Sequence, residues 1–359
     1  MSPRRSPLVP FVLAALAIGG AIAWLHKPIK AADDPLAACP ADAFLVAKVD
    51  MTQLRATPLG EIADQVLRNL VPLPSVRAEA SPCDTSKVDS LAIVVPEGDE
   101  RSDIGLAMKL RMSTTELARC ASSLSASSSS SSSRESSKQE RQGAFTLFAS
   151  GEPRADTLAA SDNGLVLLGA RAWALSMADA ASGRAPGATK SPPHADVLRA
   201  LGARTLLVSV ALPKATRARI RKEMVGDRES SAADRTAMEG VLGVEAVGAA
   251  VDVLPKTAET ELVAELRCDS VSSCAAVNDL VSRKKKAWTE NPIVRLLGLG
   301  QAADALTISL QGSRLEIRTR LRTEDLRNAL ERVLAWRKFT PNRSPAPSPA
   351  LPDAGPDGG

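Results

Sequence analysis

Residues 88–120 read VDSLAIVVPEGDERSDIGLAMKLRMSTTELARC, and residues 244–276 read VEAVGAAVDVLPKTAETELVAELRCDSVSSCAA. The two stretches align at a constant offset without a gap, so that Leu106 of the first matches Leu262 of the second. Each stretch predicts a strand, a polar turn, a second strand and then a capped helix. Self-similarity at a fixed offset indicates that the chain contains two copies of one folding unit.

The predicted elements around the two stretches also follow one order. A strand and a helix precede each stretch, and a hairpin and a final helix follow it. Ser113 and Asp269 occupy matching helix-start positions, where either side chain can accept a hydrogen bond from the first turn. The sequence therefore predicts an α+β fold: a tandem duplication of a mostly antiparallel sheet unit with helices on one face, preceded by an N-terminal apolar helix. The pattern leaves open whether the two sheets pair at an edge or stack.

Changes in composition set the predicted domain boundaries. Residues 125–142 are rich in serine and charge and have little apolar surface to bury, which predicts a disordered loop. Glycine, proline and serine mark a linker between the units. The predicted domains are a signal-anchor segment at 1–32, a first α+β unit at 39–181 that contains this loop, a linker at 182–195, a second α+β unit at 196–339 and a disordered proline-rich tail at 340–359.

Composition excludes several classes of protein. The 359 residues are 44% hydrophobic but only 3% aromatic, with no tyrosine, so the cores must be packed with alanine, leucine and valine. The net charge of +4 is too small to indicate a polyanionic partner, and basic clusters on the predicted helices at 214–224 and 270–288 lack interleaved aromatics. We therefore expect no nucleic-acid partner. These clusters are typical of solvated helix faces, with an anionic envelope surface as the alternative.

The N-terminal segment predicts targeting to the membrane. Arg4 and Arg5 precede an uncharged apolar run at 8–25, which is near the lower limit for spanning a bilayer. Ala21-Ile22-Ala23 offers a signal-cleavage site as the alternative. We favour an uncleaved anchor because the run is long for a signal peptide. In both cases the rest of the chain lies outside the cytoplasm, with the membrane as one partner and an envelope protein or lipid as another.

The predicted export also determines what we expect of the five cysteines. In an exported protein some of them are expected to form disulfides. Cys39 and Cys83 each adjoin a proline beside the first predicted strands and are our candidate disulfide. Cys268 and Cys274 are a second option, which would leave Cys120 unpaired. The spacings do not match a zinc site, and we expect no metal and no cofactor.

Few residues are suited to catalysis. Of the two histidines, His26 lies beside the apolar segment and His194 lies in the predicted linker, where we expect it to be exposed. Nucleophile–histidine chemistry is thus not indicated. Carboxylates at matching positions, Asp89 with Asp103 and Glu245 with Glu259, leave a carboxylate-based hydrolase as an alternative function. A carrier with an apolar cavity is the other alternative.

The chain as a whole resembles envelope-anchored proteins of myxobacteria-like, GC-rich bacteria. The resemblance lies in the anchor, in the duplicated unit and in the start of the exported part, where Pro40-Ala-Asp-Ala43 precedes a strand and Leu54-Arg55-Ala-Thr-Pro58-Leu59 follows it. It implies no activity and assigns no site residues. The sequence therefore predicts a non-catalytic cell-envelope protein that binds a partner or ligand outside the cytoplasm.

Overall fold

The computed structural model describes residues 30–70, 85–97, 104–113, 115–116, 119, 138–149, 156–224, 232–254, 257–292 and 303–339. The predicted apolar segment and the predicted tail lie outside these residues, except for the last residues of the former. No helix of the described residues combines the length and the apolar character that crossing a bilayer requires.

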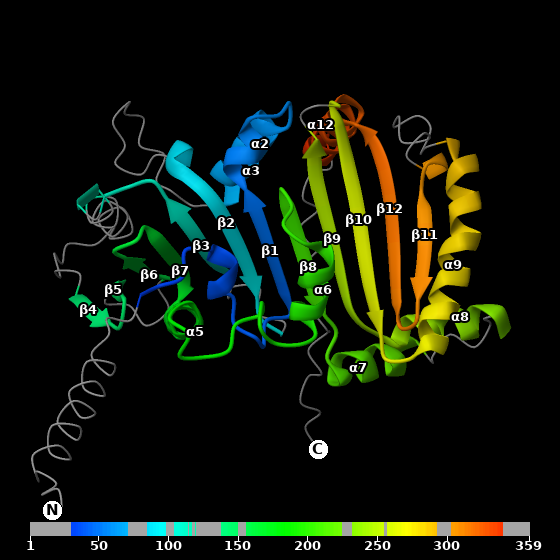
Figure 1. Ribbon diagram of the computed structural model, residues 1–359, viewed down its shortest axis with the longest axis horizontal. Coiled ribbons are helices and arrows are strands. Elements are labelled where there is room, and N and C mark those ends of the chain that lie inside the picture. The colour runs from blue at the N-terminus through cyan, green and yellow to red at the C-terminus, as the bar shows by residue number, and fades with distance from the viewer. Residues whose placement is uncertain are drawn as a thin grey trace, which may run out of the picture.

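The described strands form one sheet of twelve, and all neighbouring strands are antiparallel (Figure 1). This confirms the prediction of a mixed fold with an antiparallel sheet. The strands of the first half are β1 (Leu45–Asp50), β2 (Val88–Val95), β3 (Gly105–Leu110), β4 (Lys138–Gln142), β5 (Phe145–Ala149), β6 (Asp156–Ser161) and β7 (Leu165–Ala170). Those of the second half are β8 (Leu206–Ala211), β9 (Val244–Leu254), β10 (Glu259–Cys268), β11 (Thr307–Gln311) and β12 (Arg314–Arg322).

The two halves of the sheet join through β1 and β8 at its centre. Their register places Leu45 opposite Val210. Reading outward from this pair, one side runs β1-β2-β3-β7-β6-β5-β4 and the other runs β8-β9-β10-β12-β11. The halves therefore pair edge to edge, a choice that the sequence pattern left open. Backbone hydrogen bonds between β1 and β8 satisfy two edges that would otherwise be unpaired.

The two long hairpins differ in register. Ile93 lies opposite Leu106 in the β2–β3 hairpin, so the gapless alignment would place Ala249 opposite Leu262. In the β9–β10 hairpin Ala249 instead lies opposite Ala264, two residues further along. A shift of two residues keeps each side chain on the same face of the sheet, so the hydrophobic pattern cannot report it.

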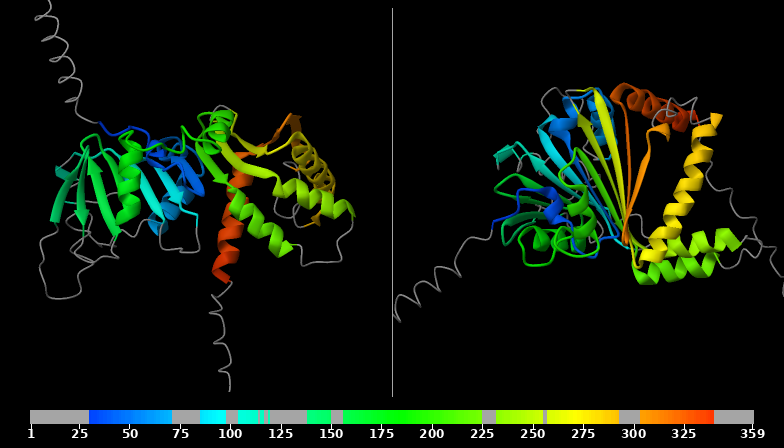
Figure 2. Two further views of the ribbon diagram at one scale, coloured as in Figure 1. Left: turned by 90° about the horizontal axis from the view of Figure 1, so that it is seen from below. Right: turned by 45° about the vertical axis from the view of Figure 1, so that its right-hand side comes forward.

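Helices cover both faces of the sheet, which corrects the prediction of helices on one face (Figure 2). The α6 face carries η1 (Pro35–Ala38), α5 (Arg171–Ala181) and α6 (His194–Leu201). The opposite face, here the α9 face, carries α2 (Met51–Arg55), α3 (Gly60–Leu70), α9 (Val271–Glu290) and α12 (Thr323–Phe339). Beside them, α8 (Ala232–Leu242) packs on α9 and contacts α7 (Lys214–Met224). Strands that carry apolar side chains on both faces need helices or loops to cover both faces of the sheet.

The two halves place their last helices on opposite faces. In the first half α5 follows β7 and packs on the α6 face, with Met177 and Ala178 against Leu165 and Leu167. In the second half α12 follows β12 and packs on the α9 face, where Leu326 reaches Leu54 of the first half. The strands β10, β12 and β11 consequently have no counterpart of α5 above them among the described residues.

Two predicted segments differ in the structure. The predicted linker at 182–195 already contains the start of α6 and a cis Pro192-Pro193 bond. The predicted loop at 125–142 contains β4 at its end, and its residues 125–137 lie outside the described residues. Composition does not report either element, because a polar segment can form a strand that completes a sheet and a proline-rich segment can lead into a helix that covers one.

The helix starts differ from each other in how they are capped. Ser113 and Glu116 exchange side-chain to backbone hydrogen bonds of 3.3 and 2.8 Å, which confirms the capping position at Ser113. At the matching site the cap of α9 is Ser270, whose Oγ accepts from the Ser273 amide at 3.1 Å. Asp269, the predicted cap, instead accepts from the Ser273 hydroxyl.

Candidate functional site

Cys39 is a free, fully buried thiol in the structure. Its predicted disulfide with Cys83 stays a prediction, because Cys83 is not among the described residues. The side chain of Cys39 is packed in the core of the first half with Leu36 and Ala43. Burial raises the pKa of the Cys39 thiol to about 12, with a smaller contribution from the charge of Asp34. A thiol in this state is neutral and unreactive at physiological pH.

Cys268 and Cys274 form a disulfide in the structure. The bond joins the end of β10 to the second turn of α9 and is buried with Val277 and Leu315. It fastens the helix to the α9 face of the outer strands. A structural disulfide is typical of proteins that fold in an oxidising compartment.

The matching carboxylates of the second half, Glu245 and Glu259, are not close together in the structure. Glu245 and Glu259 stand near opposite ends of the β9–β10 hairpin, because Glu259 pairs with Leu254 while Glu245 lies next to Val244 at the other end. Glu245 lies 3.6 Å from Arg217. Asp89 pairs with Arg111 at 2.6 Å, and Asp103 lies outside the described residues.

His194 is fully buried, which corrects the prediction of an exposed linker residue. It lies at the start of α6, with Nδ1 2.8 Å from Oγ of Ser209 and Nε2 2.8 Å from the carbonyl oxygen of Ala43. Because a carbonyl can only accept, Nε2 carries the proton and Nδ1 accepts from Ser209. The imidazole thus connects the first half, α6 and β8, which gives it a structural role.

Most side chains of the two basic clusters lie on exposed helix faces. Two of them instead contact other parts of the fold. Arg217 of α7 pairs with Asp269 at 3.2 Å, and Lys285 of α9 donates to the carbonyl of Leu306 at 2.6 Å. Lys214, Arg219 and most of the others are exposed. This agrees with the interpretation of solvated faces. Among the described residues no group of three or more histidines, cysteines and carboxylates is placed to hold a metal ion.

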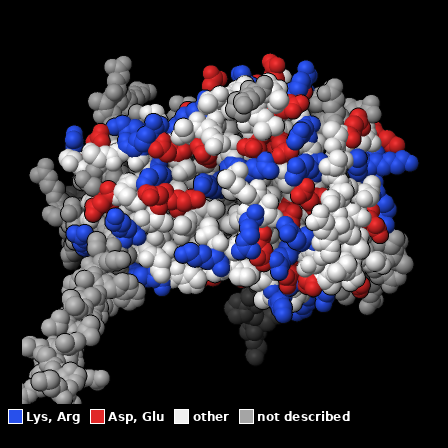
Figure 3. Space-filling model, in the orientation of Figure 1, with Lys and Arg blue, Asp and Glu red and all other residues white. Residues whose placement is uncertain are grey.

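The outer strands of the second half present a charged surface on the α6 face. The helix α6 contacts β8, β9 and β10, and beyond it Thr307, Ser309 and Gln311 of β11 are exposed. Basic and acidic side chains are interspersed over this region of the molecule (Figure 3). We call it the open face. It consists of Glu261, Glu265 and Arg267 of β10, Arg314, Glu316, Arg318 and Arg320 of β12, and Thr307, Ser309 and Gln311 of β11.

Glu261 is the buried centre of the open face. Arg320 donates to it through Nε and Nη2 at 3.1 and 3.0 Å, Arg204 donates at 2.8 Å, and Nη1 of Arg318 lies 3.5 Å away. Burial by itself would raise the pKa of Glu261. The hydrogen bonds from Arg320 and Arg204 and the charge of Arg318 outweigh it, so the pKa lies below its ordinary value. The charged carboxylate therefore holds three arginines on one patch.

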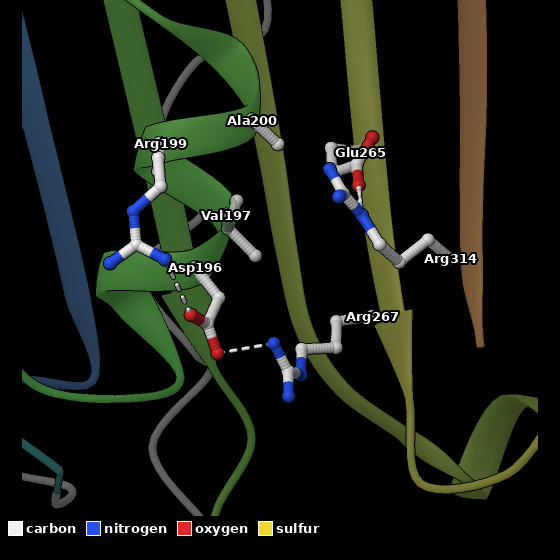
Figure 4. A pocket seen from close by; sticks show the side chains of 7 residues that line it. All are labelled: Asp196, Val197, Arg199, Ala200, Glu265, Arg267 and Arg314. Atoms are coloured by element: carbon white, nitrogen blue, oxygen red, sulfur yellow. Dashed lines mark hydrogen bonds and ion pairs between the residues drawn. The ribbon is translucent and has the colours of Figure 1, made fainter. Parts of the chain in front are cut away.

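A cleft of about 390 Å³ lies between α6 and the open face (Figure 4). It is lined by Asp196, Val197, Arg199 and Ala200 of α6, Glu265 and Arg267 of β10, and Arg314 of β12. In Figure 4 the side chain of Arg267 points toward Asp196 on α6. Three guanidinium groups thus face two carboxylates, and the cleft has a surplus of positive charge.

Each arginine of the cleft pairs with a single carboxylate, and these ion pairs leave the arginines accessible to solvent. Asp196 accepts from Arg267 and, at 3.3 Å, from Arg199. Glu265 is buried and accepts from Nε of Arg314 at 2.6 Å. The side chains of Arg199 and Arg314 remain exposed over 76% and 52% of their surface, so solvent or a ligand can reach them.

The sequence analysis did not predict the open face, because this surface contains no catalytic motif. The signal was present in residues 314–322, RLEIRTRLR, where charged and apolar side chains alternate. Residues 261–267, ELVAELR, show a related pattern. Alternation predicts a strand with one polar face. The two polar faces lie next to each other because β10 pairs with β12, and no local sequence pattern predicts that pairing.

Comparison with known proteins assigns no family. No model of a known protein family matches this sequence, and no curated protein matches it. The chain is similar to the solved structure of TP0453 in its crystal form III, with a TM-score of 0.40 and 10% identity over 83% of this chain and 98% of that one. Crystal form I of TP0453 gives a TM-score of 0.40 and 9% identity over 84% and 97% of the two chains. The resemblance to envelope-anchored proteins of myxobacteria-like bacteria stays a prediction.

Proposed function

We propose that this protein is a non-catalytic cell-envelope protein that binds a partner or ligand outside the cytoplasm through the open face of β10, β12 and β11. The observation that carries the proposal is this face itself. Seven charged side chains line the two adjacent strands β10 and β12, and the exposed polar side chains of β11 continue the surface. A polar sheet surface of this extent offers directional hydrogen bonds to a partner, which give specificity.

The extracytoplasmic location is supported by two independent features. The apolar run at 8–25 follows two arginines, as in a signal or an anchor. The disulfide between Cys268 and Cys274 is of the kind that persists outside the cytoplasm. We propose the uncleaved anchor as the form that connects the folded part to the membrane.

We also propose that the two halves of the sheet descend from one duplicated unit. The strand order outward from the β1–β8 pair supports this, because β2, β3, β7 and β6 hold the same places on one side as β9, β10, β12 and β11 on the other. A duplication followed by relocation of the last helix would free the α6 face of one copy for binding while the other copy stays covered by α5.

The location is tested by fractionation of a Gram-negative host that expresses the full chain or a variant without residues 1–32. The full chain is expected in the membrane fraction with Cys268 and Cys274 protected from alkylation until they are reduced. The shortened chain should stay in the cytoplasm with both cysteines reactive after unfolding. Cys39, a free thiol in the fold, is the internal control. A cytoplasmic full-length chain with reduced cysteines would contradict the proposal.

The binding surface is tested by a photo-crosslinking amino acid placed at Ser309 of the open face. The matched control carries the same group at Val271, which is 59% exposed at the start of α9 on the other side of the sheet. A discrete adduct in whole cells is expected at Ser309 and not at Val271. Equal adducts at both positions, or none at either, would argue against this face as the site.

A further inference from the structure

We propose that the cleft between α6 and the β10–β12 pair is a phosphate site, in which Arg267 and Arg314 bind the phosphate oxygens and Arg199 closes the rim. This inference rests on the proposed function, because it names the chemistry that one part of the open face recognises. The phosphate could belong to a small soluble molecule or to a phospholipid headgroup. The residues involved are the same in both cases.

The first argument is the pairing of like charges. Arg267 and Arg314 are direct cross-strand partners in the β10–β12 register and both point to the α6 face. Like charges directly opposite each other on antiparallel strands are unfavourable, since their β-carbons lie only about 5 Å apart. A bound anion between the two guanidinium groups would convert this repulsion into two favourable contacts. Asp196 offsets the charge of Arg267 and Glu265 offsets that of Arg314, but neither carboxylate bridges the two guanidinium groups, and a phosphate between them would do so.

The second argument is the number of unused donors. A guanidinium group has about five N–H donors. Within the cleft, Arg199 and Arg267 each use Nη1 on Asp196, and Arg314 uses Nε on Glu265. The described residues supply these three arginines with no other side-chain partner. Most of their donors therefore face solvent in the cleft, where phosphate oxygens could accept from them.

The third argument is the geometry of the cleft. Its volume of about 390 Å³ is within the usual range for a small-ligand site. The three arginines come from a helix and two strands, so they approach from different directions (Figure 4). This arrangement suits a tetrahedral group with several acceptor oxygens better than a planar carboxylate, which two donors on one guanidinium can already satisfy.

Asp196 provides a variant whose expected effect is a gain. Its carboxylate lies between Arg199 and Arg267 and competes with a bound anion for both. Replacing Asp196 with asparagine removes that negative charge and keeps the shape of the side chain. Asp196→Asn should therefore bind phosphate several-fold more tightly, whereas Arg314→Gln should bind it at least tenfold more weakly. A purely structural role for these residues would not produce opposite changes.

The experiment measures how fast phenylglyoxal modifies each arginine of the full chain, with peptide mass spectrometry as the readout. One arm adds inorganic phosphate, and a second adds phosphatidylcholine vesicles with or without phosphatidylglycerol. Chloride at matched ionic strength corrects for screening. Arg219, exposed on α7, is the internal control, and Arg219→Gln is the matched control variant. The same measurements are made on Asp196→Asn and Arg314→Gln.

Protection of Arg267 and Arg314 by inorganic phosphate, with Arg219 unprotected, would support a site for a soluble phosphate compound. Protection only by vesicles that contain phosphatidylglycerol would support a headgroup as the source. Protection by neither probe, or equal protection of Arg219, would overturn the proposal. If the Ser309 crosslink persists in that case, the open face binds its partner without a phosphate, and the proposed function stands.

Discussion

The buried carboxylate of Glu261 allows a quantitative test of how the open face is held together. The Glu261→Gln variant keeps the volume of the side chain and removes its charge, so that Arg204, Arg318 and Arg320 lose their common acceptor. Removing one partner of a buried ion pair costs about 3–5 kcal/mol. The three arginine side chains are 21%, 40% and 57% exposed and are partly solvated after the loss. We therefore expect a decrease of about 2–3 kcal/mol in the free energy of unfolding.

The assay is urea unfolding at pH 7 followed by circular dichroism, with the change taken from the shift in midpoint at constant slope. Glu316→Gln is the matched control, because Glu316 lies on the same face, is 40% exposed and pairs with Arg318 at 3.1 Å. Its loss should cost less than about 1 kcal/mol.

The pH dependence of the same variant gives a second test. The folded-state pKa of Glu261 lies below the ordinary value of 4.5, so its contribution is fully present above pH 4.5 and is lost as the pH falls through the folded pKa. The difference between wild type and Glu261→Gln should therefore shrink below pH 4.5. A Glu261→Gln variant as stable as Glu316→Gln, or a difference that persists unchanged at pH 3, would refute the reasoning.

Three further predictions concern the core and the crosslink. Burial lowers the pKa of His194 against the opposing hydrogen bond to Ala43, so wild type should lose thermal stability as the pH falls below 6.5. His194→Asn should lose that pH step, and an identical pH profile for both proteins would count against it. A Cβ added at Gly248 would overlap Val197 and approach Leu201 to 2.8 Å. Gly248→Ala should therefore lower the free energy of unfolding in urea by about 1–3 kcal/mol. The control Ala249→Ser, on the other face of the strand, should leave it unchanged. Replacing Cys268 and Cys274 with serine opens a short loop of six-residue separation and should cost about 2 kcal/mol, with an unchanged midpoint as the contradicting result.

Sequence periodicity by itself determined the local elements. Alternation of apolar side chains located the β9–β10 hairpin. The turn between β6 and β7 is equally local, because Asp162-Asn163-Gly164 is a turn sequence and Gly164 has a φ of +82°. The capping box at Ser113 was also correct. These features depend on residues that are close together in the chain, where side-chain periodicity and turn preferences act directly.

The tertiary structure decided everything that joins distant segments. It paired β1 with β8, placed α12 and α5 on opposite faces, and buried His194 against Ser209 and Ala43. It also left Cys39 unpaired while Cys268 and Cys274 formed a bond. The arginines of the cleft meet only because β10 and β12 are neighbours and α6 ends beside them. Contacts of this kind follow from which surfaces pack together across long loops, and local sequence patterns do not encode that choice.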